Sequence, residues 1–362
     1  MFWSILVFLV VLSLLVIVHE FGHFWVAKKN GIWVEEFGIG IPPRIWGKKI
    51  GDTIYSINAL PFGGFVRLHG EMTEEGVIKP NKAFINKSLW AKTAVIIAGV
   101  VMNFLLAVFA FSIVYSKYGI PVETNEVKVL DISPDSPALE AKILVGDIIK
   151  KVDGEEVTKV SNFVEKIESK KGKKVKLELQ DRVVIITPRA NPPEEQGPLG
   201  ITISSSDVYY PEWYKRPFYG MYYGFLESFE WTKRVLDGFV KIFVDLSRGE
   251  SPNDISGPVG VYAVVSETSK QGIWQLINLI GIISVNLAVL NILPFPALDG
   301  GRLLFIFIEA IFGKKVAPKV EGAIHSIGMV ILLTLILAIT IKDVRGLISA
   351  GSISNFLNSF QK

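Results

Sequence analysis

Two histidines and a glutamate lie close together after the first apolar run, in the order His19-Glu20-Phe21-Gly22-His23. Residues four apart on a helix share a face, so His19 and His23 can each direct one ring nitrogen at a single metal ion. Glu20 is typical of a base that takes a proton from an attacking water and later delivers it to a leaving amine. The pattern predicts a zinc hydrolase.

The surroundings of this motif argue against a chance match. Ionisable groups in or beside a membrane helix are energetically costly and usually mark function. The three groups follow an apolar run, and no lysine or arginine is close enough to pair with them until Lys28. A histidine resting at a membrane interface explains one such residue, but it does not explain this spacing.

A catalytic zinc site needs a third protein ligand, and Asp299 is the candidate. It lies in the segment Asn291–Gly301, whose prolines interrupt a helix and whose glycines allow close turns. Irregular backbone at membrane depth is tolerated where it lines a polar cavity. A plain interfacial turn also fits the segment alone. His69 and His325 compete for the role, although a strand-rich segment surrounds the first and an interfacial position suits the second.

The composition indicates a membrane protein, because half of the 362 residues are hydrophobic and they cluster. Each cluster approaches the ~20 residues that cross a bilayer. The first lacks the basic start and small-residue cleavage site of a signal peptide, so we expect it to be retained. The four apolar runs cover about Phe2 to Val18, Thr93 to Tyr115, Ile273 to Leu293 and Ile324 to Ile341.

The charges indicate orientation more than partners. A net charge of +3 is too small to imply nucleic acid, and the absence of cysteine excludes disulfides and thiolate metal sites. Lysines and arginines are concentrated between the first and second runs and between the third and fourth, which places both segments in the cytoplasm. The N-terminus and the polar stretch after the second run then face outward.

The segments between the runs predict distinct parts. Residues 30–71 read as short strands joined by tight turns, and a polar module follows the second run. Aromatic and charged residues then alternate in an amphipathic segment that either lies at the membrane surface or packs on the core. The predicted boundaries are 1–120 for the first membrane half, 121–210 for the module, 211–255 for the amphipathic segment, 256–345 for the second membrane half and 346–362 for a tail. Within the tail, Ala350 to Lys362 is expected to be mobile.

The polar module resembles a PDZ domain. A Ser-Pro-Ala helix start (133–138), a Gly-Asp-Ile strand and an Asp-Gly turn (146–154) occur in order, with a helix expected at 160–169 and strands at 175–180 and 183–188. The late Leu199-Gly200-Ile201 resembles the loop that binds peptide termini in the circularly permuted bacterial type, although an ordinary turn before a strand also fits. PDZ domains bind an extended chain as an added strand.

Taken together, the motifs closely resemble the site-2 protease family of intramembrane zinc metalloproteases, in the bacterial branch related to the regulator-of-sigma-E protease. The resemblance covers nearly the whole chain and is specific because the motifs occur in order. They are His19-Glu20-x-x-His23, Pro61-Phe62-Gly63-Gly64-Phe65-Val66, the step from Gly99 to Asn103, Ser256-Gly257-Pro258-Val259-Gly260 and Asn-x-x-Pro-x-Pro-x-Leu-Asp-Gly ending at Gly300.

This resemblance implies a polytopic α-helical membrane protein with about four transmembrane helices, a membrane-associated β-loop and one extracytoplasmic PDZ domain. It implies a bacterial cytoplasmic membrane enzyme that opens toward the cytoplasm, with Zn²⁺ held by His19, His23 and Asp299. The substrates would be single-span membrane proteins such as anti-sigma factors or remnant signal peptides. The implied substrate-binding residues are Asn291, Pro294, Pro296, Gly63 and Gly64.

Two other functions remain open from the sequence. One is a non-catalytic receptor that captures extracytoplasmic peptide ends through the module, with a decayed metal site; an intact Glu20 and a complete ligand set favour the enzyme. The other is a zinc-dependent transporter. Against it, this sequence lacks the repeated halves expected of many transporters.

Overall fold

The computed structural model describes residues 2–71, 77–193, 196–249, 256–313 and 316–358. Within these ranges, four helices have the length and composition to cross a membrane, in agreement with the four predicted runs. α1 continues past the first apolar run to Lys29. The histidine motif therefore lies inside this helix and not at its end, where the sequence placed it. The four helices are α1 (Phe2–Lys29), α2 (Leu89–Tyr118), α7 (Ile273–Ile292) and α9 (Pro318–Ala350).

The chain folds into two compact units. The first joins Met1–Lys117 with Pro217–Lys362 and carries α1, α7, α9 and almost all of α2. The second is Tyr118–Arg216, and the predicted module at 121–210 falls within it. A single continuous insertion therefore separates the two halves of the helical unit.

The helical unit is held together by apolar side chains between helices. Val11 and Leu15 of α1 are buried against Val265 of α6 (Pro258–Gln271) and Leu279 of α7. A second cluster joins α2 to α7 through Phe111 and other buried side chains. Most other apolar side chains on these helices are half-buried or exposed, as expected for helices that face lipid on one side.

The amphipathic segment forms α5 (Arg216–Ser247) and packs against α2. Phe225 lies edge-on to Phe104 with ring centroids 5.9 Å apart, within the range of favourable aromatic pairs. Tyr115 donates a hydrogen bond to Glu227 at 2.8 Å. This fits the alternative in which the segment packs on the core. The last part of the predicted amphipathic segment, residues 250–255, lies outside the described residues.

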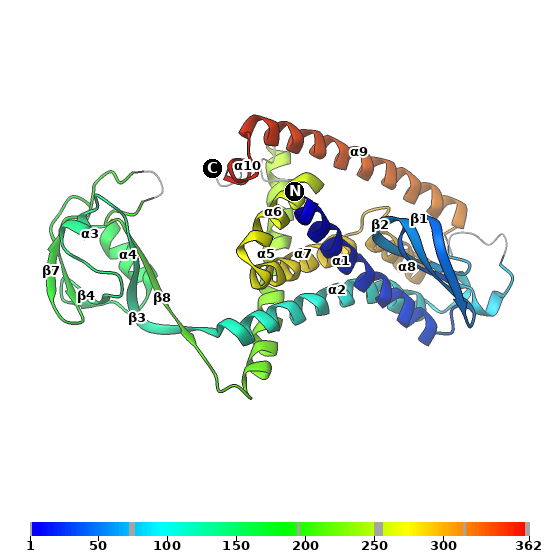
Figure 1. The fold of residues 1–362 in the computed structure, drawn as a ribbon, viewed down its shortest axis with the longest axis horizontal. Helices are drawn as coiled ribbons and strands as arrows, with labels where there is room; N and C mark the ends of the chain where they lie inside the picture. Colours follow the sequence, from blue (N-terminus) through cyan, green and yellow to red (C-terminus); the bar gives the residue numbers. More distant parts are fainter. Residues whose placement is uncertain (1, 72–76, 194–195, 250–255, 314–315, 359–362) are drawn as a thin grey trace. The chain divides into compact units, whose positions relative to one another are not determined.

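The strand-rich segment forms β1 (Val34–Ile50) and β2 (Thr53–Leu68), which lie beside α1 (Figure 1). The first half of β1 pairs with both the start and the end of β2, so that Ile39 is opposite Ile57 and also opposite Gly64. The second half of β1 pairs with the start of β2, where Lys48 is opposite Tyr55. The pairing changes register between these regions, so the strands bend. Two short 3₁₀ helices, Pro80–Lys82 and Phe84–Asn86, precede α2.

The chain after α7 turns sharply and enters α8 (Asp299–Phe312) before α9. The sequence predicts a mobile stretch from Ala350 to Lys362, and most of the part that the structure describes is helical instead. α9 continues to Ala350, and α10 (Ile353–Asn358) follows. Phe356 is 2% exposed, and its ring packs against the backbone of Gly346, where no side chain is in the way. Burial of this apolar ring away from water favours the packed position.

The second unit is a mixed α/β fold with strand order β7-β6-β4-β3-β8 and a two-residue β5 (Glu155–Glu156) beside β4. Valine, isoleucine and leucine side chains from the sheet form its core with Phe163 and Ile167 of α4. The predicted helix at 160–169, the Gly-Asp-Ile strand and the strands at 175–180 and 183–188 are confirmed. The elements are β3 (Ile120–Ile132), α3 (Pro137–Glu140), β4 (Ile148–Val152), α4 (Val160–Glu168), β6 (Val175–Leu179), β7 (Val183–Ile186) and β8 (Ile201–Tyr209).

Candidate metal centre

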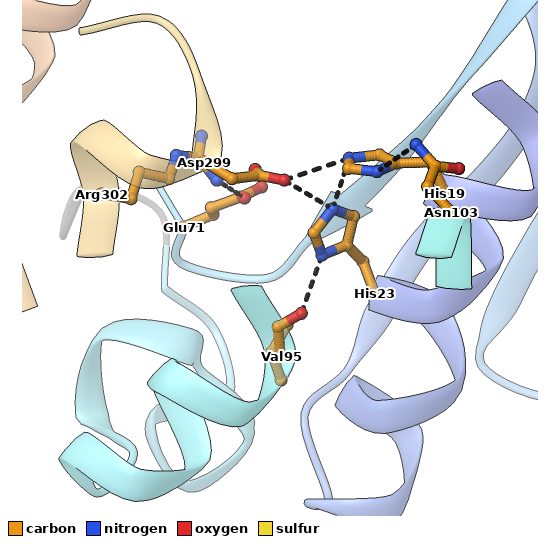
Figure 2. Close-up of polar contacts among 7 residues, drawn as sticks. All are labelled: His19, His23, Glu71, Val95, Asn103, Asp299 and Arg302. Carbon is orange, nitrogen blue, oxygen red and sulfur yellow. Dashed lines mark hydrogen bonds and ion pairs between the residues drawn. The ribbon is translucent and has the colours of Figure 1, made fainter. Parts of the chain in front are cut away.

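His19, His23 and Asp299 converge in the first unit, although the aspartate is far away in the sequence (Figure 2). Nε2 of His19 lies 3.0 Å and Nε2 of His23 lies 3.3 Å from Oδ2 of Asp299, and the two nitrogens are 3.1 Å apart. A tetrahedral zinc site with bonds of about 2.0–2.2 Å places its ligand atoms roughly 3.3–3.6 Å apart. The three separations are close to this range, so the three atoms could hold one metal ion.

The hydrogen bonds around His23 support this fit. Its Nδ1–H donates to the carbonyl oxygen of Val95 on α2, at 2.8 Å. When this ring is neutral, Nε2 carries no proton and presents an electron pair to the carboxylate of Asp299. Oδ2 of Asp299 is buried and accepts no hydrogen bond from the described residues. Two electron-pair donors that face each other at 3.3 Å repel unless a cation lies between them.

His19 is supported by Asn103 on α2. The amide group of Asn103 is fully buried and its nitrogen lies 3.4 Å from Nδ1 of His19, while its oxygen has no partner among the described residues. Exchanging the amide oxygen and nitrogen gives Nδ1–H an acceptor and leaves Nε2 free to bind a metal. A buried asparagine in a membrane helix must find polar partners, and the imidazole of His19 is one of them.

Gly99 allows α2 to pass directly against both imidazoles. A Cβ at this position would overlap Nε2 of His23 and would lie 2.7 Å from Cε1 of His19. Real Cβ atoms do not approach other heavy atoms so closely, so any side chain here must displace the rings. The absence of a side chain at Gly99 therefore lets α2 lie directly against the two imidazoles of the candidate metal centre.

We expect Gly99→Ala to weaken zinc binding by at least about tenfold, the lower range for loss of a group that orients metal ligands. The measurement is zinc per protein after equilibration against a series of zinc buffers. Gly238→Ala is the matched control, because a Cβ on Gly238 meets no atom within 4 Å. Equal zinc affinity of Gly99→Ala and wild type would contradict the steric role of this glycine.

Asp299 is positioned by a tight loop, Leu293–Leu298, and by the start of α8. A Cβ on Gly300 would overlap the carbonyl oxygen of Leu293, and a Cβ on Gly301 would lie 2.5 Å from that of Phe295. The prediction that the glycines permit close backbone approach is confirmed. Ala297 has a φ of 83°, a left-handed conformation that costs a residue with a side chain about 1–3 kcal/mol. Packing around the loop must hold it in place.

Glu20 points into a cavity of about 720 Å³ that also reaches His19, His23 and Asp299. It is not one of the three converging ligands. β2 passes close to it, since a Cβ on Gly64 would lie 3.9 Å from Cγ of Glu20. A carboxylate beside a metal centre and within the same cavity can exchange protons with a water there.

Two ion pairs in the cavity were missed by sequence reasoning, which used Arg302 and Lys92 only as orientation charges. Arg302 on α8 pairs with Glu71 after β2 (Figure 2), and Lys92 on α2 pairs with Glu309 on α8 at 3.1 Å. Charged residues beside long apolar runs usually need a partner. That rule could have predicted that Arg302 and Lys92 each have an acidic partner, although it could not have predicted which acidic residue.

The competing histidines have other partners. Nδ1–H of His69 donates to Oε1 of Glu35 at 2.6 Å, and Nε2 accepts from the backbone N–H of Lys79 at 3.2 Å. Nδ1 of His325 accepts from the backbone N–H of Ala297 at 3.0 Å. Neither joins the group of three ligands, so the structure favours Asp299 over both.

The other predicted site residues are not gathered at the cavity. Phe65 and Val66 of β2 line it, whereas Gly63, Asn291, Pro294 and Pro296 are not among its lining residues. In the second unit, Leu199 is 2% exposed and belongs to the core, so its side chain is not presented to a peptide. The backbone carbonyl of Gly200 accepts from Ser133, and Ile201 begins β8.

Comparison with known proteins gives matches to peptidases and zinc metalloproteases over most of the chain. A family model described as peptidase family M50 matches residues 7–335. A Clostridium acetobutylicum protein with a provisional zinc metalloprotease name is 34% identical over 349 residues, covering 95% of this chain and 98% of the relative. Zinc metalloprotease RasP of Geobacillus kaustophilus is 29% identical, covering 94% and 98%. The regulator of sigma-W protease RasP of Bacillus subtilis is 28% identical, covering 95% and 99%.

Proposed function

Because the chain belongs to peptidase family M50, the site-2 protease family, we propose that it hydrolyses peptide bonds within or near the transmembrane segments of single-span membrane proteins. The family makes it a zinc-dependent metalloprotease, and its four apolar helices fit a multi-pass membrane protein. One observation carries the proposal: two of the three converging ligands lie inside α1, a helix apolar enough to span a bilayer.

We assign His19, His23 and Asp299 as the zinc ligands, since their three atoms converge and Oδ2 of Asp299 accepts no hydrogen bond from the described residues. Bound zinc would polarise the scissile carbonyl and make water a stronger acid. Glu20 is the group that accepts the proton of the attacking water and passes it to the leaving amine. Val95 and Asn103 hold the imidazoles in the required orientation.

The substrate is proposed to bind as an extended strand along β2. A transmembrane helix hides its peptide bonds in internal hydrogen bonds, so it must unwind before water can attack. The end of β2 pairs with β1, and Gly64 lies beside Glu20. Strand addition there would replace the lost helical hydrogen bonds and carry the peptide past the proposed base. Family resemblance alone supports a role in substrate binding for Asn291, Pro294, Pro296 and Gly63.

The substrate class follows from the resemblance and from relatives named for sigma-factor regulation. We propose anti-sigma factors already shortened by another protease, or remnant signal peptides. The location proposed is the bacterial cytoplasmic membrane, with the N-terminus outside and the active site open to the cytoplasm. The lysines and arginines between α1 and α2 support this orientation.

The direct test is cleavage in reconstituted liposomes of a single-span substrate, with product masses locating the cut. We expect the cut to fall within the apolar segment and to be faster when glycine or proline weakens that helix. Cleavage confined to soluble segments of the substrate would contradict the proposal.

The second unit is proposed to be a circularly permuted PDZ domain. Its edge strand β8 follows the Gly-Pro-Leu-Gly turn and has α4 nearby, which supports a groove between them. Extracytoplasmic peptide ends would bind in this groove as an added strand.

Removing this unit is expected to alter substrate choice more than chemistry. Ile120 pairs with Tyr209, so a short linker can join the chain at this point. We expect the shortened protein to cleave a pre-shortened substrate at a rate within severalfold of wild type while discriminating less against full-length proteins. Paired digests of the two substrates measure this. Complete loss of cleavage, in a protein that still binds zinc, would make the unit part of the catalytic machinery.

A further inference from the structure

His325 on α9 has two ring nitrogens in different situations. Nδ1 accepts a hydrogen bond from the backbone N–H of Ala297, at 3.0 Å. A ring nitrogen that accepts carries no proton, so the neutral imidazole has its proton on Nε2. Nε2 is therefore a fixed hydrogen-bond donor.

This donor is buried and has no hydrogen-bond partner among the described residues. The ring cannot simply turn toward solvent, because Nδ1 is held by Ala297 and the ring packs beside Phe305 with centroids 5.7 Å apart. Buried polar atoms in native proteins are nearly always paired, so an unpaired one calls for an unseen partner.

The cavity of the metal centre is where that partner would lie. His325 lines the same cavity as Glu20 and the three ligands. Within the described chain, the cavity-lining side chains with a buried polar atom lacking a hydrogen bond are Asp299 and His325. The proposed zinc ion accounts for Asp299. Nothing in the proposed chemistry so far uses Nε2 of His325.

We propose that Nε2–H of His325 donates a hydrogen bond to a backbone carbonyl oxygen of the unwound substrate segment. This deepens the proposed function and rests on it. A peptide that has left its helix in a low-dielectric site has carbonyls without partners, and each needs a donor. The apolar cavity side chains, such as Phe65, Ile306 and Met329, supply none.

Support of the Asp299 loop does not explain this nitrogen. The loop is also fixed from α9 by Gly328, where a Cβ would lie 2.7 Å from the carbonyl oxygen of Pro296. Nδ1 of His325 contributes to that support through Ala297, whereas Nε2 does not take part. The two nitrogens can therefore be tested separately.

Amide side chains separate the two roles. The amide of asparagine reaches the position of Nδ1, and that of glutamine reaches the position of Nε2. His325→Asn should keep the acceptor for Ala297 and lose the donor, while His325→Gln should keep a donor in the cavity. The substrate probe is a synthetic single-span peptide with glycine and proline in its apolar segment, reconstituted in liposomes with the full chain.

We expect His325→Asn to bind zinc like wild type and to cleave the probe with a kcat/KM about tenfold lower, the effect of one lost hydrogen bond. His325→Gln should retain most of the activity. In a Glu20→Gln background, His325→Asn should also bind the probe about tenfold more weakly. Ser326→Ala is the control, because Ser326 lines the same cavity but donates its hydroxyl to Gly322 of its own helix.

Wild-type kcat/KM in His325→Asn, or equal losses in the asparagine and glutamine variants, would overturn the role of Nε2. Loss of zinc from both variants would show that His325 acts only through the loop, and would also overturn it. These results leave the protease assignment intact as long as wild type cuts the probe and Glu20→Gln does not. Failure of wild type to cut any transmembrane probe defeats both proposals.

Discussion

Glu20→Gln is expected to lower the hydrolysis of a transmembrane substrate by about 10²–10⁴-fold, the usual contribution of a general base. Glutamine keeps the size of glutamate but cannot accept the proton of the attacking water. Zinc content should stay at the wild-type level, because Glu20 is not one of the three converging ligands. Initial cleavage rates in liposomes and zinc per protein are the two measurements.

The matched control for this variant is Glu267→Gln. Glu267 lies on α6 and pairs with Lys270 at 2.8 Å, outside the cavity of the metal centre. Its replacement should change neither rate nor zinc content. Unchanged turnover in Glu20→Gln would remove Glu20 from the mechanism. Loss of zinc together with turnover would instead make this side chain part of the metal site.

The proposed zinc ligand Asp299 should have the second large effect. Asp299→Asn replaces the buried carboxylate that lies 3.0 and 3.3 Å from the two imidazole nitrogens. A neutral amide oxygen is a weaker ligand, and an amide nitrogen turned toward the site offers no electron pair. We expect zinc affinity to fall by more than the roughly 10–100-fold that follows loss of an outer-shell partner. Competition with a chelator of known affinity measures the change.

Asp343→Asn is the matched control for Asp299→Asn. Asp343 is also a buried carboxylate, on α9, and its Oδ2 accepts the backbone N–H groups of Gly257 and Gly260 at the start of α6. The substitution should affect stability more than zinc. Equal zinc affinity in Asp299→Asn and wild type would refute the ligand role of Asp299. Partial recovery of cleavage by excess zinc would support it.

The sequence alone predicted how the two histidines of α1, the proposed ligand pair, lie relative to each other. His19 and His23 share a helical face because four residues make about one turn, and the apolar run around them is long enough to form that helix. The prolines and glycines before and after Asp299 likewise predicted a broken helix, since proline removes a backbone donor and clashes with the preceding turn. These features depend on spacing along the chain.

The sequence alone did not determine which distant residue completes the pair. Asp299, His69 and His325 all remained candidates until packing placed the first at the imidazoles and gave the others different partners. The same holds for Phe356, which was assigned to a mobile tail and is buried.

The sequence therefore determined the spacing of the proposed zinc-binding pair, the four apolar helices and the strands beside them, because local periodicity and composition encode these features. Only the tertiary structure decided that Gly99 lies against the ligands, that Arg302 pairs with Glu71 and that Nε2 of His325 is left without a partner in the cavity. Contacts between distant segments depend on how side chains of several helices pack together, and no spacing within one segment specifies them.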